Sequence, residues 1–253
     1  MFKVDNLMEY GHLFEDYDHN RAVIYACLRG QYACDLYVNQ EENPDWAILF
    51  TPFDFHYLGG DSNTPNLEKD LETIIFKSYL LRGDKKEGVF FTPDRAWDQV
   101  LEVVFKAYKG IKDHRNIYYL DPRRFERLNH FGQLPPGIKV HMDQEQAQGS
   151  REAYPICRVE LDGLTVASCA GFMTGQGHSE ITITTEEGHR KKGYGRLAAQ
   201  YLIDHLIDLE IAADWNTWPY RKASGHLAKS LGFDLYKRVP VHIWVEDHCG
   251  PLK

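Results

Sequence analysis

The spacing of hydrophobic and polar positions in the first half of the chain alternates between two periods. Three segments carry apolar residues at helical spacing, namely residues 21–30, 66–81 and 97–108. Four apolar runs beside them are typical of strands, namely residues 32–38, 46–60, 89–93 and 116–120. We expect residues 46–60 to form one buried strand that ends in a turn, and Asn66 and Asp94 to cap the helices that follow them. This alternation predicts an α/β unit with some parallel pairing.

The second half has a different pattern. Four strand-like segments are separated only by turn residues, which predicts an antiparallel meander over residues 137–142, 154–163, 164–177 and 179–185. A helix follows at residues 196–209, with Ala198 and Leu202 on its apolar face and Gln200 on its polar face. The remaining elements are expected to be a strand at 211–215, a short helix at 225–230 that ends at Gly232, and a closing hairpin of residues 233–239 and 240–247.

Two prolines and two glycines cluster at residues 130–137. We therefore expect a boundary there, between an N-terminal α/β domain at residues 1–134 and a second domain at residues 135–253. The alternative is an internal loop of a single domain.

Composition narrows the class of protein. The chain has 253 residues, of which 43% are hydrophobic and 26% charged, and no apolar run is long enough to span a bilayer. Because its first residues are acidic and interrupted, we expect no signal peptide, no membrane association and a cytoplasmic location. The net charge of −8 disfavours a nucleic-acid partner.

The cysteines and histidines give no metal signature. Five cysteines are dispersed without a CxxC pair, which favours reduced thiols. The spacing of His242, His248 and Cys249 matches no zinc motif, so no metal is expected.

A basic, glycine-containing loop, HRKKGYGR at residues 189–196, stands between the last strand of the meander and the long helix. Backbone N–H groups, the positive end of the helix dipole and three consecutive cations converge there, which predicts a phosphate-binding site. Gly193 and Gly195 let the main chain approach a phosphate closely.

Two other interpretations of this loop are open. The residues from Gly193 to Ala198 also fit the dinucleotide-binding pattern G-x-G-x-x-A, with Asp214 near the place of a ribose-binding acid. The strand before the loop argues against it, because residues 181–185 alternate in polarity whereas that fold buries both faces of its strand. A purely structural glycine turn is the second interpretation.

The segment from Arg190 to Gly195 also resembles the R/Q-x-x-G-x-G/A motif of GNAT-superfamily acetyltransferases, and residues 215–233 resemble the strand, loop and helix that follow it in that family. In detail, the residues at 168–170 and 224–233 resemble a bacterial branch that includes zwittermicin-resistance acetyltransferases. The resemblance covers about residues 137–245. It implies an α/β (α+β) GNAT fold, with a mixed, mostly antiparallel sheet flanked by helices. A second α/β domain would precede it, for which a degenerate GNAT-like repeat is one interpretation.

The resemblance implies acetyl-coenzyme A as co-substrate. Backbone amides from Lys191 to Arg196 would bind its pyrophosphate, and its pantetheine arm would pair with the strand before the loop, where two strands splay apart. The residues expected to bind it are Ile183, Thr184, Thr185, Arg190, Lys191, Lys192, Gly193, Tyr194, Gly195, Arg196 and Asn216.

The catalytic residues are less directly indicated. Amide formation needs a base for the amine, and Glu180 resembles the position of the glutamate that often serves in the family. Glu186 and Glu187 are alternatives. The usual family tyrosine, a general acid, falls on Ala228, and the usual asparagine falls on Arg221. Two tyrosines could supply the missing hydroxyl, namely Tyr220 and Tyr236.

The expected function is an N-acetyltransferase that transfers acetyl directly to a primary amine of a small molecule. A non-catalytic coenzyme-A-binding or regulatory module is the alternative, which the missing tyrosine favours. The N-terminal half would shape either the acceptor pocket or the interface of a homodimer.

Overall fold

The computed structural model describes residues 1–82, 85–146 and 148–246, and it contains two compact units. The first unit comprises Met1–Asp18, Cys27–Arg115 and the chain from Val239, and the second comprises His19–Ala26 and Asn116–Arg238. The predicted boundary between residues 134 and 135 does not coincide with this division, because residues 116–134 pack within the second unit and the last strand re-enters the first. A division of the chain into domains at that boundary stays a prediction.

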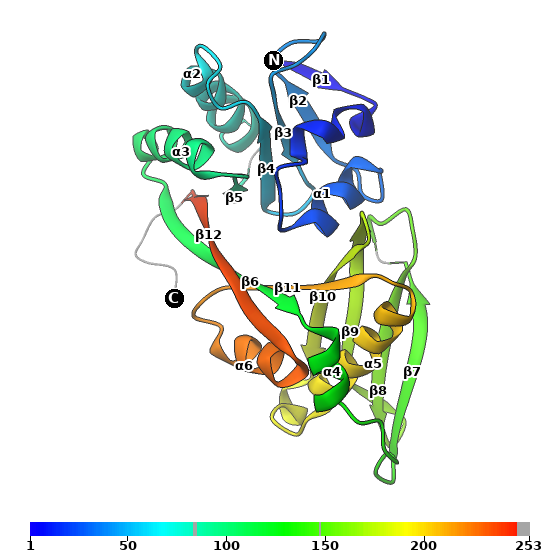
Figure 1. Ribbon diagram of the computed structural model, residues 1–253. Coiled ribbons are helices and arrows are strands. Elements are labelled where there is room, and N and C mark those ends of the chain that lie inside the picture. The colour runs from blue at the N-terminus through cyan, green and yellow to red at the C-terminus, as the bar shows by residue number, and fades with distance from the viewer. Residues whose placement is uncertain (83–84, 147, 247–253) are drawn as a thin grey trace. The chain divides into compact units, whose positions relative to one another are not determined.

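The first unit is built on a mixed sheet with the strand order β1-β2-β3-β4-β5-β12 (Figure 1). The strands are β1 (Phe2–Val4), β2 (Asp35–Val38), β3 (Trp46–Phe50), β4 (Phe55–Gly60), β5 (Glu87–Phe91) and β12 (Phe233–Val245). Neighbouring strands are antiparallel except β4 and β5, which are parallel as the α/β pattern predicts. The helical segments are a 3₁₀ helix at Leu7–Phe14, α2 (Leu67–Leu71), a π-helical stretch at Glu72–Leu80 and α3 (Arg95–Ala107). Helix α1 (Arg21–Leu28), strand β6 (Ile111–Leu120) and strand β12 contribute residues to both units.

The predicted single strand at residues 46–60 is wrong, because this run forms the hairpin β3–β4. The turn is satisfied locally by Thr51, whose hydroxyl accepts a hydrogen bond from the backbone N–H of Phe53 and donates one to the carbonyl of Phe55. A continuous apolar run hides such a turn from periodicity. The cap at Asp94 is confirmed, since its side chain accepts from the backbone N–H of Trp97. Asn66 stands at the N-cap of α2 without a side-chain capping bond.

The second unit carries a sheet with the strand order β6-β11-β10-β9-β8-β7. Its other strands are β7 (Ile138–Glu145), β8 (Tyr154–Leu161), β9 (Leu164–Gly175), β10 (His178–Thr185) and β11 (Ala212–Thr217). Strands β7 to β10 form the predicted antiparallel meander, and β10 pairs in parallel with β11. The helices are α4 (Pro122–Leu128), α5 (Tyr194–Asp208) and α6 (Lys222–Leu231), with a 3₁₀ turn at Glu187–His189.

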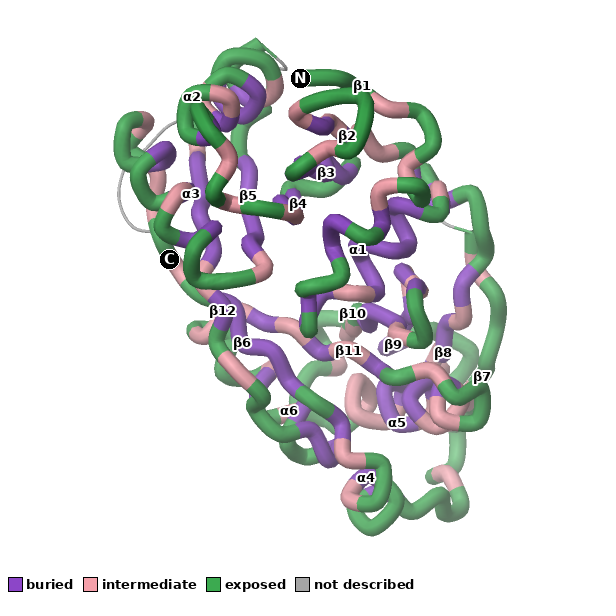
Figure 2. The backbone as a smooth tube through the Cα atoms, turned by 45° about the horizontal axis from the view of Figure 1, so that its top comes forward, coloured by how far each residue is buried: buried purple, intermediate pink, exposed green. Residues whose placement is uncertain are grey.

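Helix α5 packs across β8, β9 and β10 and closes the core of the second unit, where its buried residues alternate with partly buried ones (Figure 2). Ala198 and Leu202 lie in this core as predicted. Gln200 is 4% exposed, which corrects its placement on the solvent side, because the segment after α4 covers that part of the helix. Gly232 ends α6 in the left-handed conformation, as expected of a helix C-terminal glycine.

The predicted closing hairpin is also wrong, because β12 is one strand from Phe233 to Val245. Pro240 is the first residue of the second strand of that predicted hairpin. The fixed φ of proline is compatible with extended chain, and the residues after it continue into the ladder with β5.

Candidate active site

The basic loop forms the N-terminus of α5, as the sequence predicts. Gly193 is the residue before the helix and has φ +90°, and Lys191 has φ +62°. A Cβ atom at Gly195 would lie 2.6 Å from the hydroxyl oxygen of Thr185, so the loop backbone lies directly against the end of β10. The two glycines are therefore needed for two different reasons, one for its backbone conformation and one for close approach.

A cavity of about 690 Å³ lies beside this loop, within the second unit. One wall is the end of β10 and the loop, and the other is β11 and the start of α6. Its lining residues are Ile183, Thr184, Thr185, His189, Arg190, Lys191, Gly193, Tyr194, Gly195, Arg196, Trp215, Arg221, Ala223, Ser224 and Leu227. Most of the residues expected to bind the cofactor are thus brought together, although Lys192 and Asn216 are not among those that line it.

Lys192 instead lines a neighbouring cavity of about 430 Å³, formed mainly by residues 130–135 and the first turns of α5. The side chain of Arg196 borders both cavities and is engaged structurally. Its guanidinium donates to the side-chain oxygen of Asn129 at 2.7 Å and to the carbonyls of Leu128 and Ser230. The Arg196 side chain therefore binds the segment after α4 to the end of α6. The backbone N–H of Arg196 lies in the first turn of α5.

Strands β10 and β11 separate beside this cavity. Their parallel ladder consists of three residue pairs and ends at Glu180 and Asp214. Beyond that point β11 pairs with β6, beginning at Trp215 and Tyr118, while β10 continues to Thr185 paired only with β9. The predicted splay is present, and it leaves backbone groups of β10 facing the gap beside the loop.

The two faces of the splay carry different chemistry. Ile181 and Trp215 point toward α5 and α6, where they join the apolar core. Glu180 and Asn216 point to the opposite face, because side chains alternate along a strand. The splay thus has a cavity of about 690 Å³ on one face and the buried side chain of Glu180 on the other.

The Glu180 carboxylate is held by an amide. It is 8% exposed, and its Oε2 accepts a hydrogen bond of 2.6 Å from Nδ2 of Asn216. The same nitrogen donates to the side-chain oxygen of Asn20 at 3.1 Å. Because an amide N–H can only donate, Oε2 is the acceptor in this hydrogen bond. Asn216, predicted to bind the cofactor, is placed by the structure as the partner of Glu180.

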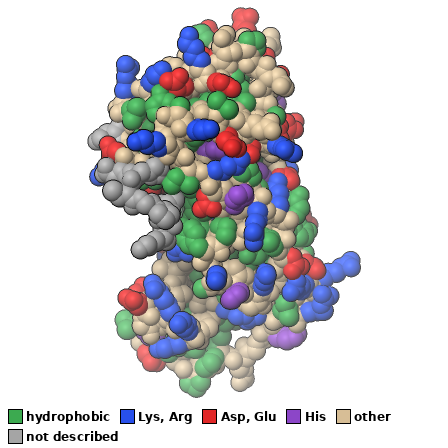
Figure 3. Space-filling model, turned by 90° about the vertical axis from the view of Figure 1, so that its left-hand side faces the viewer, with side chains coloured by type: hydrophobic (Ala, Val, Ile, Leu, Met, Phe, Trp, Pro, Cys, Tyr) green, Lys and Arg blue, Asp and Glu red, His purple; other side chains and the backbone are tan. Residues whose placement is uncertain are grey.

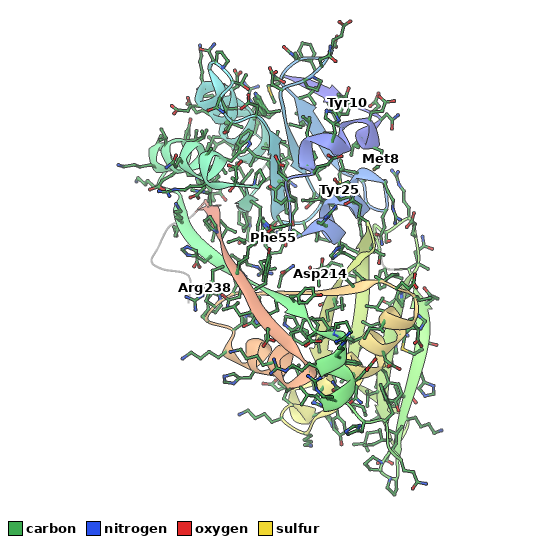
Figure 4. The ribbon with its side chains drawn as sticks, viewed as in Figure 1. Met8, Tyr10, Tyr25, Phe55, Asp214 and Arg238 are labelled. Atoms are coloured by element: carbon green, nitrogen blue, oxygen red, sulfur yellow. The ribbon has the colours of Figure 1, made fainter. Side chains whose placement is uncertain are left out.

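A second titratable pair lies one step back along the same face. Nδ1 of His178 is 2.9 Å from a carboxylate oxygen of Asp214, which lies at the end of the β10–β11 ladder (Figure 4). This hydrogen bond raises the pKa of His178 above its ordinary value. A carboxylate and a readily protonated imidazole therefore flank Glu180 on one polar face.

Neither tyrosine expected to supply the acid lines the cavity. Tyr220 is 47% exposed and stacks on Trp218, and Tyr236 is 56% exposed. Ala228, at the usual tyrosine position, is fully buried in the core. The catalytic roles of these residues stay predictions.

Two hydroxyls near α6 were missed by sequence reasoning. Ser224 lines the cavity, and its oxygen accepts a hydrogen bond of 3.1 Å from Nε1 of Trp215. The hydroxyl of Tyr118, on β6, lies under α6, 2.6 Å from where a Cβ of Gly225 would be. The sequence carried no signal for either, because both depend on which strand lies beneath the helix.

The described residues contain no group of three or more side chains that could hold a metal ion. His242 is hydrogen-bonded to Asp98, and the other two residues considered for zinc, His248 and Cys249, lie outside the described residues.

Basic and acidic side chains are interspersed on the face shown in Figure 3. Among the described helices, none combines the length and apolar character needed to cross a membrane.

Part of the chain matches a known family. Residues 156–241 match a family model described as GNAT acetyltransferase, and that match contains β9, β10, the loop, α5, β11 and α6. Over most of its length the chain has structural neighbours of GNAT fold, among them a tandem GNAT protein. No curated protein sequence matches the chain.

Three solved structures illustrate the likeness. A GCN5-related N-acetyltransferase-like protein from Streptococcus suis is 19% identical, with a TM-score of 0.65 over 94% of this chain and 98% of that chain. A GCN5-related N-acetyltransferase from Kribbella flavida is 16% identical, with a TM-score of 0.61 over 91% of this chain and 97% of that one. A tandem GNAT protein from the clavulanic acid biosynthesis pathway is 12% identical, with a TM-score of 0.61 over 92% and 89%. At these identities the likeness concerns the fold.

Proposed function

We propose that the second unit is an acetyl-coenzyme-A-dependent N-acetyltransferase that acts on a primary amine of a small molecule. The observation that carries the proposal is the splay of β10 and β11, which joins the glycine-loop cavity to the buried carboxylate of Glu180. A phosphate-binding loop alone would fit many ligands. A phosphate-binding loop, an open strand edge and a base that follow one another along β10 fit a thioester donor.

The residues present fit coenzyme A. Gly193 and Gly195 leave the loop backbone bare at the N-terminus of α5, where amide N–H groups and the helix dipole favour a diphosphate. Arg190 and Lys191 line the same cavity and add positive charge. The open edge of β10 from Ile183 to Thr185 offers backbone partners to the amide groups of pantetheine.

The opposite face fits the acceptor chemistry. The bound thioester would supply an activated acetyl group, and the chain must supply a base for the attacking amine. The carboxyl group of Glu180 accepts a hydrogen bond at Oε2 and lies at the end of the ladder, beside the opening. It would take the proton of the amine, directly or through one water molecule, while the amine attacks from its side of the sheet. The acetyl group would pass directly from the thioester to the amine, because no covalent enzyme intermediate is needed.

The alternative is a coenzyme-A-binding or regulatory module without turnover. It is favoured by the burial of Ala228 and by the absence of Tyr220 and Tyr236 from the cavity lining. The zwittermicin-resistance branch, a cytoplasmic location and a homodimer also remain predictions.

Calorimetry with coenzyme A, followed by thioester turnover with a panel of amines, tests the proposal. We expect binding, and thiol release that depends on the amine. Binding without turnover on any amine would favour the module. If coenzyme A does not bind at all, both assignments fail.

A further inference from the structure

The orientation of the Ser224 hydroxyl is fixed by its neighbour. An indole N–H can only donate, so in the bond between Trp215 Nε1 and Ser224 the serine oxygen is the acceptor. Ser224 makes no other side-chain hydrogen bond within the described residues. Its own O–H proton is therefore available to a molecule in the cavity that it lines.

Ser224 lies at the end of the cavity away from the phosphate loop. Its partner Trp215 is the first residue of β11 after the ladder with β10, so it is level with Ile181, four residues before Thr185. At a rise of about 3.3 Å per residue, this position lies roughly 13 Å along the strand from the loop. In coenzyme A the sulfur is at the end of the molecule furthest from the phosphates.

We propose that the Ser224 hydroxyl donates a hydrogen bond to the sulfur of the bound thioester and of the thiolate that leaves it, with Trp215 as the residue that positions this hydroxyl. The inference rests on the proposed function. It gives the leaving sulfur a partner that belongs to this chain and does not depend on a tyrosine at position 228.

In this reaction the amine nitrogen forms a bond to the carbonyl carbon, and its proton passes to Glu180. The C–S bond then breaks and its electron pair goes to sulfur, where the Ser224 O–H stabilises the charge without giving up its proton. The thiolate takes a proton from solvent on release.

Other hydroxyls in the unit are less suitable. Tyr220 and Tyr236 are not among the residues that line the cavity. The hydroxyl of Tyr118 faces Gly225 from beneath α6, and Tyr118 is not among the lining residues either. Ser230, on the same helix, donates its hydroxyl proton to the carbonyl of Leu227 at 2.8 Å, and it provides a matched control.

The test measures the thiol of bound coenzyme A. Calorimetric affinities for coenzyme A and for its desulfo analogue are determined between pH 6.5 and 9.5 with the unaltered protein and with the Ser224→Ala, Ser224→Thr and Ser230→Ala variants. A donor to the thiolate lowers the pKa of the bound thiol below the ordinary thiol value of about 8.5, so affinity for coenzyme A should rise with pH relative to the analogue.

We expect Ser224→Ala to reduce the increase in coenzyme A affinity with pH about tenfold, which corresponds to a bound-thiol pKa about one unit higher. Binding of the desulfo analogue should be unchanged. Ser224→Thr, which keeps a hydroxyl, and Ser230→Ala should behave like the unaltered protein. An unchanged pH dependence in Ser224→Ala would overturn the inference, and so would a loss shared equally by the desulfo analogue. If the unaltered protein binds neither ligand, the proposed function fails instead.

Discussion

Gly193 offers a direct test of how the loop works, because its backbone conformation and its place in the cavity make separate predictions. Its φ of +90° is one that residues with a Cβ rarely adopt, yet no atom lies within 4 Å of a Cβ built there. Gly188, in the 3₁₀ turn just before the loop, has equally open space and no positive φ. The pair therefore separates conformational strain from steric clash.

The magnitude follows from the backbone. Forcing an L-residue into the left-handed region costs roughly 1–2 kcal/mol. For a chain of this size, 1 kcal/mol corresponds to about 2–4 °C in melting temperature, so Gly193→Ala should melt about 2–8 °C lower than the unaltered protein. Gly188→Ala should stay within about 0.5 kcal/mol, as is usual for surface changes.

Binding gives the second readout. Gly193→Glu would put a carboxylate in the cavity where we expect the diphosphate. Two unit charges about 4 Å apart repel by about 4 kcal/mol at an effective dielectric constant of 20, so affinity for coenzyme A should fall by roughly 10² to 10³-fold.

Calorimetry and thermal melting of the three variants check both parts. If Gly193→Ala melts together with Gly188→Ala, the argument from φ is wrong. Tight coenzyme A binding by a folded Gly193→Glu protein would refute the phosphate site.

Two further predictions concern titratable groups. Glu180→Gln should lower kcat by about 10²-fold or more without changing coenzyme A affinity, since a glutamine oxygen can still accept from Asn216; full activity, judged beside the exposed control Glu126→Gln, would remove Glu180 as the base. His56 is buried and accepts from the backbone N–H of Thr51, and burial lowers its pKa to about 3. Between about pH 6.5 and pH 3 only the unfolded state binds this proton, so the free energy of unfolding should fall by about 2–3 kcal/mol between pH 6.5 and 4.5 because of His56. Urea denaturation should show that the His56→Leu variant avoids this loss. Equal losses in both proteins would contradict the assignment.

Local signals predicted the parts of the site that depend on local structure. The glycines of the loop, the cap at Asp94 and the end of α6 at Gly232 each follow from the backbone conformation of one residue and its near neighbours. The meander β7–β10 was predictable for the same reason, since short turns allow few ways to pair consecutive strands.

Patterns failed where a distant segment decides the outcome. The sequence pattern predicts that Gln200 faces solvent on α5, but residues 130–135 cover it. The sequence pattern predicts a hairpin of residues 233–239 and 240–247, but the ladder with β5 keeps the chain extended after Pro240. Periodicity reports how a segment alternates and carries no information on which other segment covers it.

The sequence by itself predicted the basic glycine loop at the start of α5, the order of the elements around it and Glu180 as a candidate base. Only the tertiary structure decided what surrounds them. The register of β10 against β11 joins Glu180 to Asn216, and the packing of α6 over β11 sets Ser224 against Trp215. The physical reason is that a hydrogen bond between residues far apart in the chain depends on strand register and helix placement, which the cooperative packing of the whole unit fixes.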